Sequence, residues 1–297
     1  MAKRYHDMHN LHLKVNPTRG ADSHSISHLR SDDAVNSGSP GAFAAQLSWP
    51  EVERRVKAGA VAVLPVGAAC KEHGPHLPMN TDFLQAEWLA GALVQRAEVL
   101  VWPTVTYGYY PAFSDYPGSV SLKRETFQHM VQEILSEIRR AGVRAVLILN
   151  TGISTIEPLK AAVGDIPEAM RIELANVYSG PRCRSSTETL EEQTRGGHAD
   201  ELETSILLAI GREHVALGKA QTWIPPAVAV SGPFSRSDPD NPRFSPFGVW
   251  GDPTLASEEK GRRLLAAMVD DLFAAVEALQ GEQKAAPRPD GAGGGDL

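Results

Sequence analysis

Strand, loop and helix alternate along the middle of this chain, and this alternation is the feature that most constrains its fold. Residues 61–67 (VAVLPVG) and 143–150 (VRAVLILN) are short apolar runs, which are typical of strands buried on both faces. Each run leads through a polar loop into a stretch with helical spacing, over residues 82–97 and from about Glu157. This order predicts an α/β domain with a mainly parallel sheet that helices cover on both faces.

The clearest helix is expected over residues 125–142, where apolar residues recur at helical intervals and Gly142 stands at the C-terminal stop. Residues 100–108 (LVWPTVTYG) predict another strand. Because Pro103 interrupts it and cannot donate to a ladder, this strand is expected near a sheet edge.

The two ends of the chain lack the apolar spacing of the middle. Five of the ten histidines lie in the first forty residues among polar neighbours, and the far end carries the run GAGGGD. We therefore expect a flexible arm at 1–42, a single domain at 43–280 and a disordered tail at 281–297. Histidine-rich tracts bind metal in some proteins, but scattered solvated histidines are the simpler interpretation of the arm.

Composition excludes several classes of partner. The chain has 297 residues, 42% of them hydrophobic, which suits one large domain, and its formal net charge of −7 argues against nucleic acid. Its apolar runs are far shorter than the roughly 20 residues that cross a bilayer. The only cysteines, Cys70 and Cys183, form no disulfide framework, so a reducing cytoplasm is expected.

Residues 71–82 (KEHGPHLPMNTD) gather two histidines, a glutamate and an aspartate directly after a predicted strand. Ligands of parallel sheets lie beyond the carboxyl ends of the strands, so this segment should meet the loop at 150–155. Carboxylates and imidazoles together suit Zn²⁺, Mn²⁺ or Fe²⁺. Alternatively, His73 and His76 are hydrogen-bonded loop residues and Asp82 caps the following helix.

Four collinear motifs resemble the creatininase family of metal-dependent amidohydrolases. They are LPVGAACKEHGPHLPMNTDFLQAEWLA at 64–90, GYYPAFSDYPGSVSL at 108–122, GGHADELETSILLA at 196–209 and GVWGDPTLASEEKG at 248–261. The resemblance runs from about Leu47 to Leu279. It implies a three-layer α/β/α sandwich, a site for one or two divalent metals at the strand ends, a small-molecule substrate and a homo-oligomer.

By this resemblance, His73 and Asp82 correspond to a metal-binding histidine and aspartate of the family. The family glutamate two positions before the histidine is replaced by Lys71, while Glu72 lies directly next to His73. Either a one-residue bulge brings Glu72 into the ligand position, or Lys71 replaces a metal charge locally. The expected ligands are therefore Glu72, His73 and Asp82.

The loop after the strand at 143–150 departs from the family. Typical members read Asn-Gly-His-Gly-Gly-Asn there and use the histidine as a metal ligand, whereas this chain reads NTGIST at 150–155. Ser154 stands where some members carry a second metal-binding carboxylate. We therefore expect one Zn²⁺, Mn²⁺ or Fe²⁺ ion, or none, rather than two.

The resemblance makes His198 and Glu203 candidates for catalysis through proton transfer, although a first-turn glutamate is also favoured simply by the helix dipole. Cys70 is interpreted as a packing residue rather than a nucleophile. Aromatic residues near Tyr110 either wall a substrate pocket or cover the core. The candidate substrate-binding residues are His76, Asn150, Thr151, Ser154 and Tyr110.

Two functions of different class follow. The first is metal-assisted hydrolysis of a C–N bond in a small cyclic amide or a formamide-like compound. The second is a non-catalytic protein of the same fold that binds a small metabolite or a partner subunit through the loop at 150–155.

Overall fold

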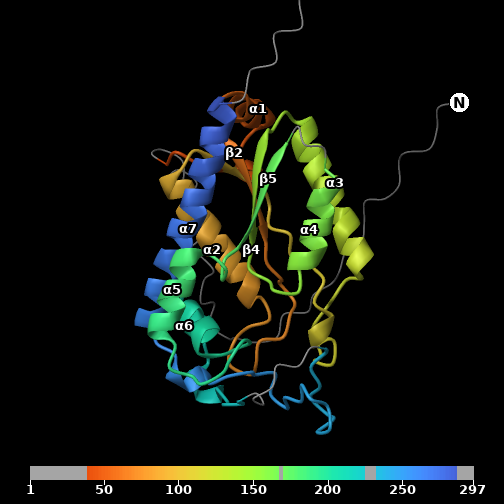
Figure 1. The fold of residues 1–297 in the computed structure, drawn as a ribbon, viewed down its shortest axis with the longest axis vertical. Coiled ribbons are helices and arrows are strands. Elements are labelled where there is room, and N and C mark those ends of the chain that lie inside the picture. The colour runs from red at the N-terminus through yellow and green to blue at the C-terminus, as the bar shows by residue number, and fades with distance from the viewer. Residues whose placement is uncertain (1–38, 167–169, 225–231, 286–297) are drawn as a thin grey trace, which may run out of the picture. The chain divides into compact units, whose positions relative to one another are not determined.

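The computed structural model describes residues 39–166, 170–224 and 232–285. Within them, five parallel strands form one sheet in the order β1-β3-β2-β4-β5 (Figure 1). The strands are β1 Ala42–Phe43, β2 Val61–Val66, β3 Val99–Val101, β4 Ala145–Asn150 and β5 Arg171–Asn176. The parallel sheet expected from the alternation of strand and helix is confirmed.

Helices cover both faces of the sheet. On one side lie α2 Thr81–Arg96, α5 Pro181–Leu190, α6 Glu201–Ile210 and α7 Glu258–Ala285, and on the other α3 Arg124–Arg140 and α4 Ile156–Gly164 (Figure 1). The short helix α1 Trp49–Lys57 precedes β2. Single 3-10 turns occur at Ala44–Gln46, Pro111–Phe113, Arg212–His214, Leu217–Lys219 and Pro253–Leu255.

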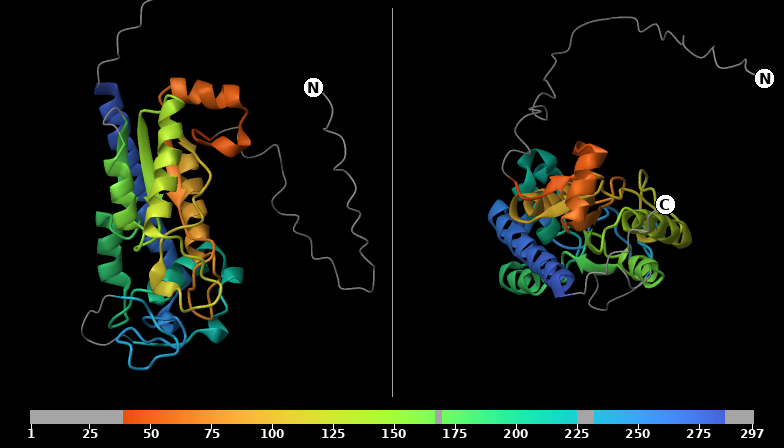
Figure 2. Two further views of the ribbon diagram at one scale, coloured as in Figure 1. Left: turned by 90° about the vertical axis from the view of Figure 1, so that its right-hand side faces the viewer. Right: turned by 90° about the horizontal axis from the view of Figure 1, so that it is seen from above.

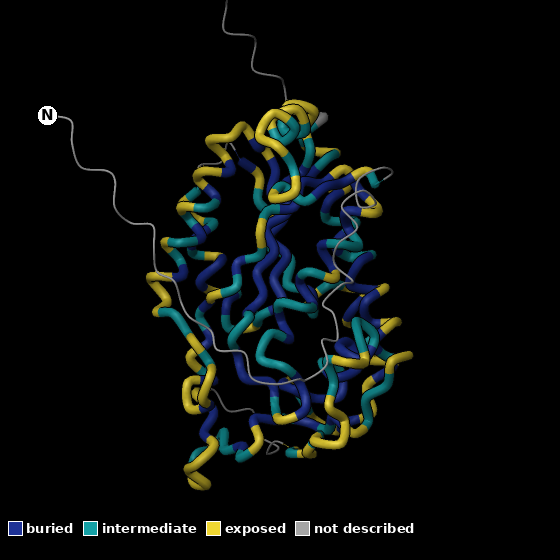
Figure 3. Tube along the Cα trace, turned by 180° about the vertical axis from the view of Figure 1, so that it is seen from behind, coloured by how far each residue is buried: buried dark blue, intermediate teal, exposed yellow. Residues whose placement is uncertain are grey.

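The central strands are buried on both faces because successive side chains point to opposite sides. Val61, Val63 and Leu147 pack against α2, α6 and α7, whereas Leu64 and Ile148 pack against α3 and α4. Figure 3 shows these strands as a dark blue interior between more exposed helices. Two apolar cores on the two sides of one sheet make the α/β/α sandwich that the resemblance implied.

Helix α3 agrees with its predicted apolar stripe. Its fully buried residues are Phe127, Val131, Leu135 and Ile138, which lie three or four positions apart. Gly142, just beyond the helix, has φ of 95°, a left-handed conformation that favours glycine at a helix end.

Strand β3 is shorter than the expected strand at 100–108. It ends at Val101, before Pro103, and lies near the edge of the sheet, covered on its outer side only by the two-residue strand β1. Beyond the strand, the amides of Trp102 and Val105 still donate to carbonyl oxygens of β2. Pro103 falls between these two donors, so no ladder bond is lost and the segment continues along β2.

The domain boundaries can be compared with the structure only in part. The sheet begins at Ala42, and α7 continues to Ala285, five residues past the expected boundary at 280. The rest of the expected arm, residues 1–38, and of the expected tail, residues 286–297, lie outside the described residues. No helix in the described ranges is both long and apolar enough to cross a membrane.

The loops that follow the strands gather at one end of the sheet, at the lower end of Figure 2, left. The hydroxyl of Thr151, just after β4, lies 3.2 Å from the carbonyl oxygen of Val66 and 3.1 Å from that of Asp82. The segments at 71–82 and 150–155 therefore meet, as the parallel topology predicted.

Candidate active site

Six titratable side chains are buried together at this end of the sheet. Lys71, Glu72 and His73 come from the loop after β2, and Asp82 lies in the first turn of α2. His198 precedes α6 and Glu203 lies in its first turn. Their side chains are between 0% and 13% exposed. Burying so many charges is costly unless they are paired or hold an ion.

His73 is held by one nitrogen and presents the other to a carboxylate. Its Nδ1 lies 2.9 Å from the carbonyl oxygen of Lys71, which can only accept, so Nδ1 carries a proton. Its Nε2 lies 3.1 Å from Oδ1 of Asp82. Because neutral Nε2 is an acceptor, this contact requires either a second proton on the imidazole or a cation beside it.

Asp82 also forms an ion pair with Lys71, whose Nζ lies 2.7 Å from Oδ2. Burial alone would raise the pKa of Asp82, but the Lys71 ammonium and His73 outweigh it and lower that pKa. Burial likewise opposes the charged form of Lys71, yet the carboxylates of Asp82, Glu203 and Glu72 raise its pKa. Both side chains are therefore charged at neutral pH.

His198 lies between two carboxylates. Its Nε2 is 3.0 Å from Oε2 of Glu72, and its Nδ1 is 3.6 Å from Oε2 of Glu203. Burial alone would lower the pKa of His198, but Glu72 and Glu203 together raise it. The ring of Phe113 packs against His198 at a tilt of 43°, with 4.3 Å between the ring centroids, which shields the imidazole from water.

The backbone before α6 is shaped to position Glu203. Ala199 has φ of 47°, a left-handed conformation that is strained for a residue with a side chain, and its amide donates to Oε2 of Glu203 at 2.6 Å. Asp200 caps α6 by accepting from the amides of Leu202 and Glu203 at 2.9 and 3.1 Å. Burial, together with the charge of Glu203, raises the pKa of Asp200 to about 6.

Three of these residues are placed to hold a metal ion. His73, His198 and Glu203 each offer a ligand atom, and these atoms lie within 4.8 Å of one another. Imidazole nitrogen and carboxylate oxygen are ligands for Zn²⁺ and for Mn²⁺. This chain's own residues therefore fit a divalent ion.

The three residues that fit an ion in the structure differ from the three ligands expected from the sequence. Of the expected ligands, His73 belongs to the three-residue group, while Asp82 and Glu72 contact the two histidines of that group. His198 and Glu203, expected for proton transfer, supply the other two ligand atoms. Asp82 instead directs one oxygen to Lys71.

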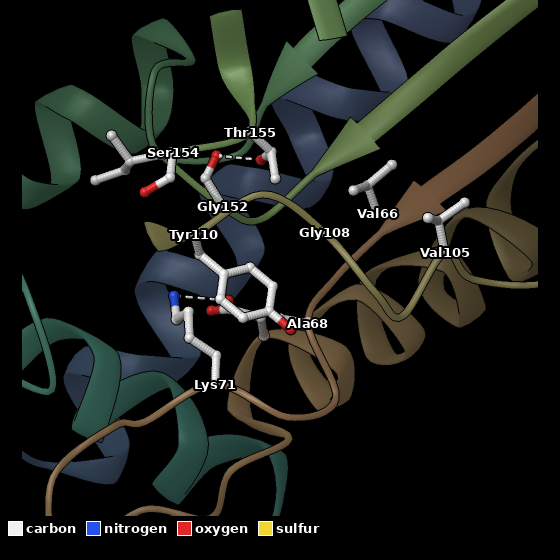
Figure 4. Close-up of a pocket in the computed structure, with 11 residues that line it drawn as sticks. Val66, Ala68, Lys71, Val105, Gly108, Tyr110, Gly152, Ser154 and Thr155 are labelled. Carbon is white, nitrogen blue, oxygen red and sulfur yellow. Dashed lines mark hydrogen bonds and ion pairs between the residues drawn. The ribbon is translucent and has the colours of Figure 1, made fainter. Parts of the chain in front are cut away.

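A small pocket with a volume of about 20 Å³ is lined in part by the Lys71–Asp82 pair. Tyr110 and Ser154, two of the expected substrate-binding residues, line it, and Figure 4 shows Lys71 and Tyr110 on one side with Ser154 and Thr155 across from them. The remaining lining is mostly small or apolar: Val66, Ala68, Val105, Gly108, Gly152 and Ile153.

The other expected substrate-binding residues make hydrogen bonds within the protein. Asn150 donates to the carbonyl oxygen of Gly152 at 2.6 Å and accepts from the hydroxyl of Thr155 at 2.7 Å. Thr151 bonds across to the neighbouring loops, as described above, and Nε2 of His76 lies 2.8 Å from the hydroxyl of Thr204. None of the three lines the pocket.

Gly248 is a site residue that sequence reasoning missed. It has φ of 69°, and a Cβ at this position would lie 1.9 Å from Oε1 of Glu72. The carboxylate of Glu72 therefore packs directly on the backbone of the segment at 248–261. The motif at 248–261 marked this segment as important, but the spacing of its residues did not show that Gly248 lies against Glu72.

A buried imidazole and carboxylate centre at the carboxyl ends of a parallel sheet is an arrangement suited to metal-assisted hydrolysis. A family model described as Creatininase, creatinine amidohydrolase, matches residues 45–276. The chain belongs to the creatininase family, as the four motifs predicted.

Individual relatives agree with this assignment. A creatinine amidohydrolase of Pseudomonas putida is 27% identical over 80% of this chain and 97% of its own length. A mycofactocin precursor peptide peptidase of Mycolicibacterium smegmatis is 28% identical over 70% of this chain and 81% of its own length. A solved structure described as creatininase Mn superposes with a TM-score of 0.70 at 26% identity. The match covers 80% of this chain and 99% of that structure's chain. These similarities support hydrolase activity for this chain.

Proposed function

We propose that this chain is a metal-dependent amidohydrolase that cleaves a C–N bond in a small amide, either cyclic or formamide-like. The observation that carries the proposal is the convergence of His73, His198 and Glu203 within 4.8 Å in a buried centre. Relatives named for the hydrolysis of creatinine and of a precursor peptide support the reaction class.

His73, His198 and Glu203 would hold the ion, and the surrounding residues orient them. The Lys71 carbonyl binds Nδ1 of His73, and Glu72 binds Nε2 of His198, so each imidazole is left with its other nitrogen for the ion. When bound, a divalent ion supplies a Lewis acid for the substrate carbonyl and lowers the pKa of water.

The pocket next to the Lys71–Asp82 pair is the proposed place for the substrate. Lys71 and the hydroxyl of Ser154 supply polar groups to it, while Val66, Val105 and Ile153 give it apolar walls. The hydroxyl of Tyr110 donates to the Cys70 carbonyl at 3.2 Å, which fixes the ring that forms one side of the pocket. This mixed lining suits the carbonyl and the apolar body of a compact amide, for which the pocket of about 20 Å³ would have to widen.

The first experiment is metal removal and replacement. Treatment with a chelator should abolish hydrolysis of a panel of lactams, formamides and short peptide amides, and Zn²⁺, Mn²⁺ or Fe²⁺ should restore it. Asp82→Ala should lower activity strongly, because it removes the partner of both Lys71 and His73. Activity that is indifferent to the chelator and to this substitution would contradict the proposal.

Proton transfer to the leaving nitrogen by His198 or Glu203 is the alternative to a role of that residue as a ligand. Nδ1 of His198 and Oε2 of Glu203 lie 3.6 Å apart, which is an ion-pair contact rather than a hydrogen bond. Metal analysis of His198→Ala and Glu203→Gln separates the two roles. Loss of bound metal indicates a ligand, whereas loss of activity with metal retained indicates proton transfer.

The ion pair of Lys71 with Asp82 favours one alternative, a non-catalytic protein that binds a small metabolite or a partner subunit. The pair neutralises a carboxylate of the centre without any metal. Purified protein that contains no stoichiometric metal, is inactive on the panel and still binds a metabolite would favour this alternative.

Assembly and location belong to the proposal as well. We propose a homo-oligomer in the cytoplasm, as the family resemblance and the two free cysteines suggest. Light scattering on the full chain measures the molar mass of the particle in solution. The mass of a single chain would contradict the proposed homo-oligomer.

A further inference from the structure

We infer that the ammonium of Lys71 serves as a built-in second cation of this centre, so that the centre binds one divalent ion and not two. The inference deepens the proposed function and rests on it. It assigns to Lys71 a role in setting the number and affinity of bound ions.

The geometry shows that Asp82 already has its partners. One oxygen lies 2.7 Å from Nζ of Lys71, and the other lies 3.1 Å from Nε2 of His73. The side chains of Lys71 and Asp82 are only 8% and 2% exposed, so water does not weaken the pair. Phe113 adds to this shielding, with its ring centroid 5.0 Å from Nζ. Asp82 does not belong to the three-residue group whose ligand atoms lie within 4.8 Å of one another.

The charge balance of the buried cluster gives the ion count. The cluster contains three carboxylates, of Glu72, Asp82 and Glu203, and one ammonium, that of Lys71, which pairs with Asp82. With both imidazoles neutral, as metal ligands must be, the cluster carries a net charge of minus two. One divalent cation cancels this charge. A second would leave an excess of two positive charges in a buried place, which is strongly unfavourable.

A further carboxylate, that of Asp200, interacts with Glu203 but has its own hydrogen-bond donors. This carboxylate accepts four hydrogen bonds, with donor–acceptor distances of 2.8 to 3.1 Å. The donors are the backbone amides of Gly197, Leu202 and Glu203 and the side-chain amide of Gln193. Four hydrogen bonds within the protein therefore already compensate its charge.

The test counts ions and measures their affinity on the full chain. The metal-stripped protein is titrated with Mn²⁺ alone, the bound ions are counted by native mass spectrometry, and the dissociation constant is measured by calorimetry. Wild type should bind one ion. Lys71→Gln should bind its first ion about tenfold more tightly or better, because a competing positive charge has been removed. Lys71→Arg, which keeps the charge, should stay near wild type.

The sign of the Lys71→Gln effect separates the inference from a merely structural role. If Lys71 only held Asp82 in place, its loss would loosen the centre and weaken the binding of Mn²⁺. Equal or weaker binding by Lys71→Gln therefore overturns the inference, as does a wild-type count of two ions, and both results leave the proposed hydrolase standing. A wild-type count of zero refutes the metal centre itself. The number of Mn²⁺ ions bound by the wild-type protein tests the expected count of one even if a variant does not fold.

Discussion

Each imidazole of the centre is held by one nitrogen and left with the other facing a carboxylate. For His73 the fixed nitrogen is Nδ1, and for His198 it is Nε2. Such a hydrogen bond sets the tautomer and the ring orientation, so that the free nitrogen is ready for a cation. At the residue scale, the site therefore depends on the groups that orient the histidines, Glu72 and the Lys71 carbonyl, as much as on the histidines.

The packing of Gly248 on Glu72 predicts a large effect from one methyl group. Gly248→Ala would place Cβ 1.9 Å from Oε1 of Glu72 and would strain a backbone with φ of 69°. We expect a loss of about 1–3 kcal/mol in the free energy of unfolding, with a larger relative loss of activity, because Glu72 must move away from His198. Urea denaturation and the hydrolysis assay measure the two losses.

Gly91→Ala is the matched control, because Gly91 lies inside α2 with open space around its Cβ position. This control should be neutral or slightly stabilising. The interpretation fails if both alanine variants behave like wild type.

His76 predicts a dependence of stability on pH. Burial lowers its pKa from 6.5 to about 4, because the charged imidazole loses its water. A lowered pKa in the folded state means that stability is full above pH 6.5 and falls as the pH drops through 4, since the unfolded chain takes up the proton first. The difference of about 2.5 pKa units corresponds to an upper limit of roughly 3 kcal/mol.

His76→Gln should remove most of this dependence, because glutamine keeps a polar partner for Thr204 but does not titrate. The measurement compares urea midpoints at pH 7.5 and pH 4.5 with those of His129→Gln, an exposed histidine. An equal loss of stability at low pH in wild type and His76→Gln would rule out His76 as the cause.

At the scale of elements, the centre is built where the first turns of two helices meet the loops after β2 and β4. Asp82 lies in the first turn of α2, and Glu203 lies in that of α6. The positive end of each helix dipole favours an ionised carboxylate there. The two helices pack on the same face of the sheet, which brings these first turns together.

The cap of α6 can be tested through Asp200. Asp200→Ala removes the acceptor for the amides of Leu202 and Glu203 and should cost about 1–2 kcal/mol of stability. It should also weaken metal binding, because the turn that carries Glu203 loses its anchor. Asp200→Asn, which keeps an acceptor oxygen, should retain most of both properties. Identical stability of the alanine and wild-type proteins would contradict the role of the cap.

For the described domain as a whole, metal binding should appear as thermal stability. An ion that binds only the folded state at 100 times its dissociation constant adds about 2.7 kcal/mol. For a domain of this size that corresponds to a rise of roughly 5–10 °C in Tm. Calorimetry with and without Mn²⁺ measures it, and His73→Ala should abolish the rise. An unchanged Tm in wild type would argue against the centre.

Much of the fold was accessible from the sequence because burial leaves a local pattern. Residues 61–66 and 145–149 are continuous apolar runs, and α3 has a regular stripe, so these elements were predicted within two residues of their ends. β5 escaped because RIELAN is polar and only partly buried. The two-residue edge strand β1, which pairs with β3, also escaped because it has no sequence signal.

The residues of the site were predictable as types but not as contacts. His73, Asp82, His198 and Glu203 stood out through motifs, yet the pairing of Glu72 with His198 joins residues 126 positions apart. Motif spacing describes neighbours along one segment, whereas hydrogen bonds between loops depend on how several segments pack. The roles of Asn150 and Thr151 likewise depend on partners in the folded loop.

The sequence by itself determined the α/β class, the order of the main elements and the end of the sheet where the polar loops meet, because strand burial and parallel topology follow from local apolar patterns. Only the tertiary structure decided that Lys71 pairs with Asp82 and that His73, His198 and Glu203 form one group. The physical reason is that ion pairs and ligand groups form through space, at distances of a few ångströms that packing sets and the order of residues does not encode locally.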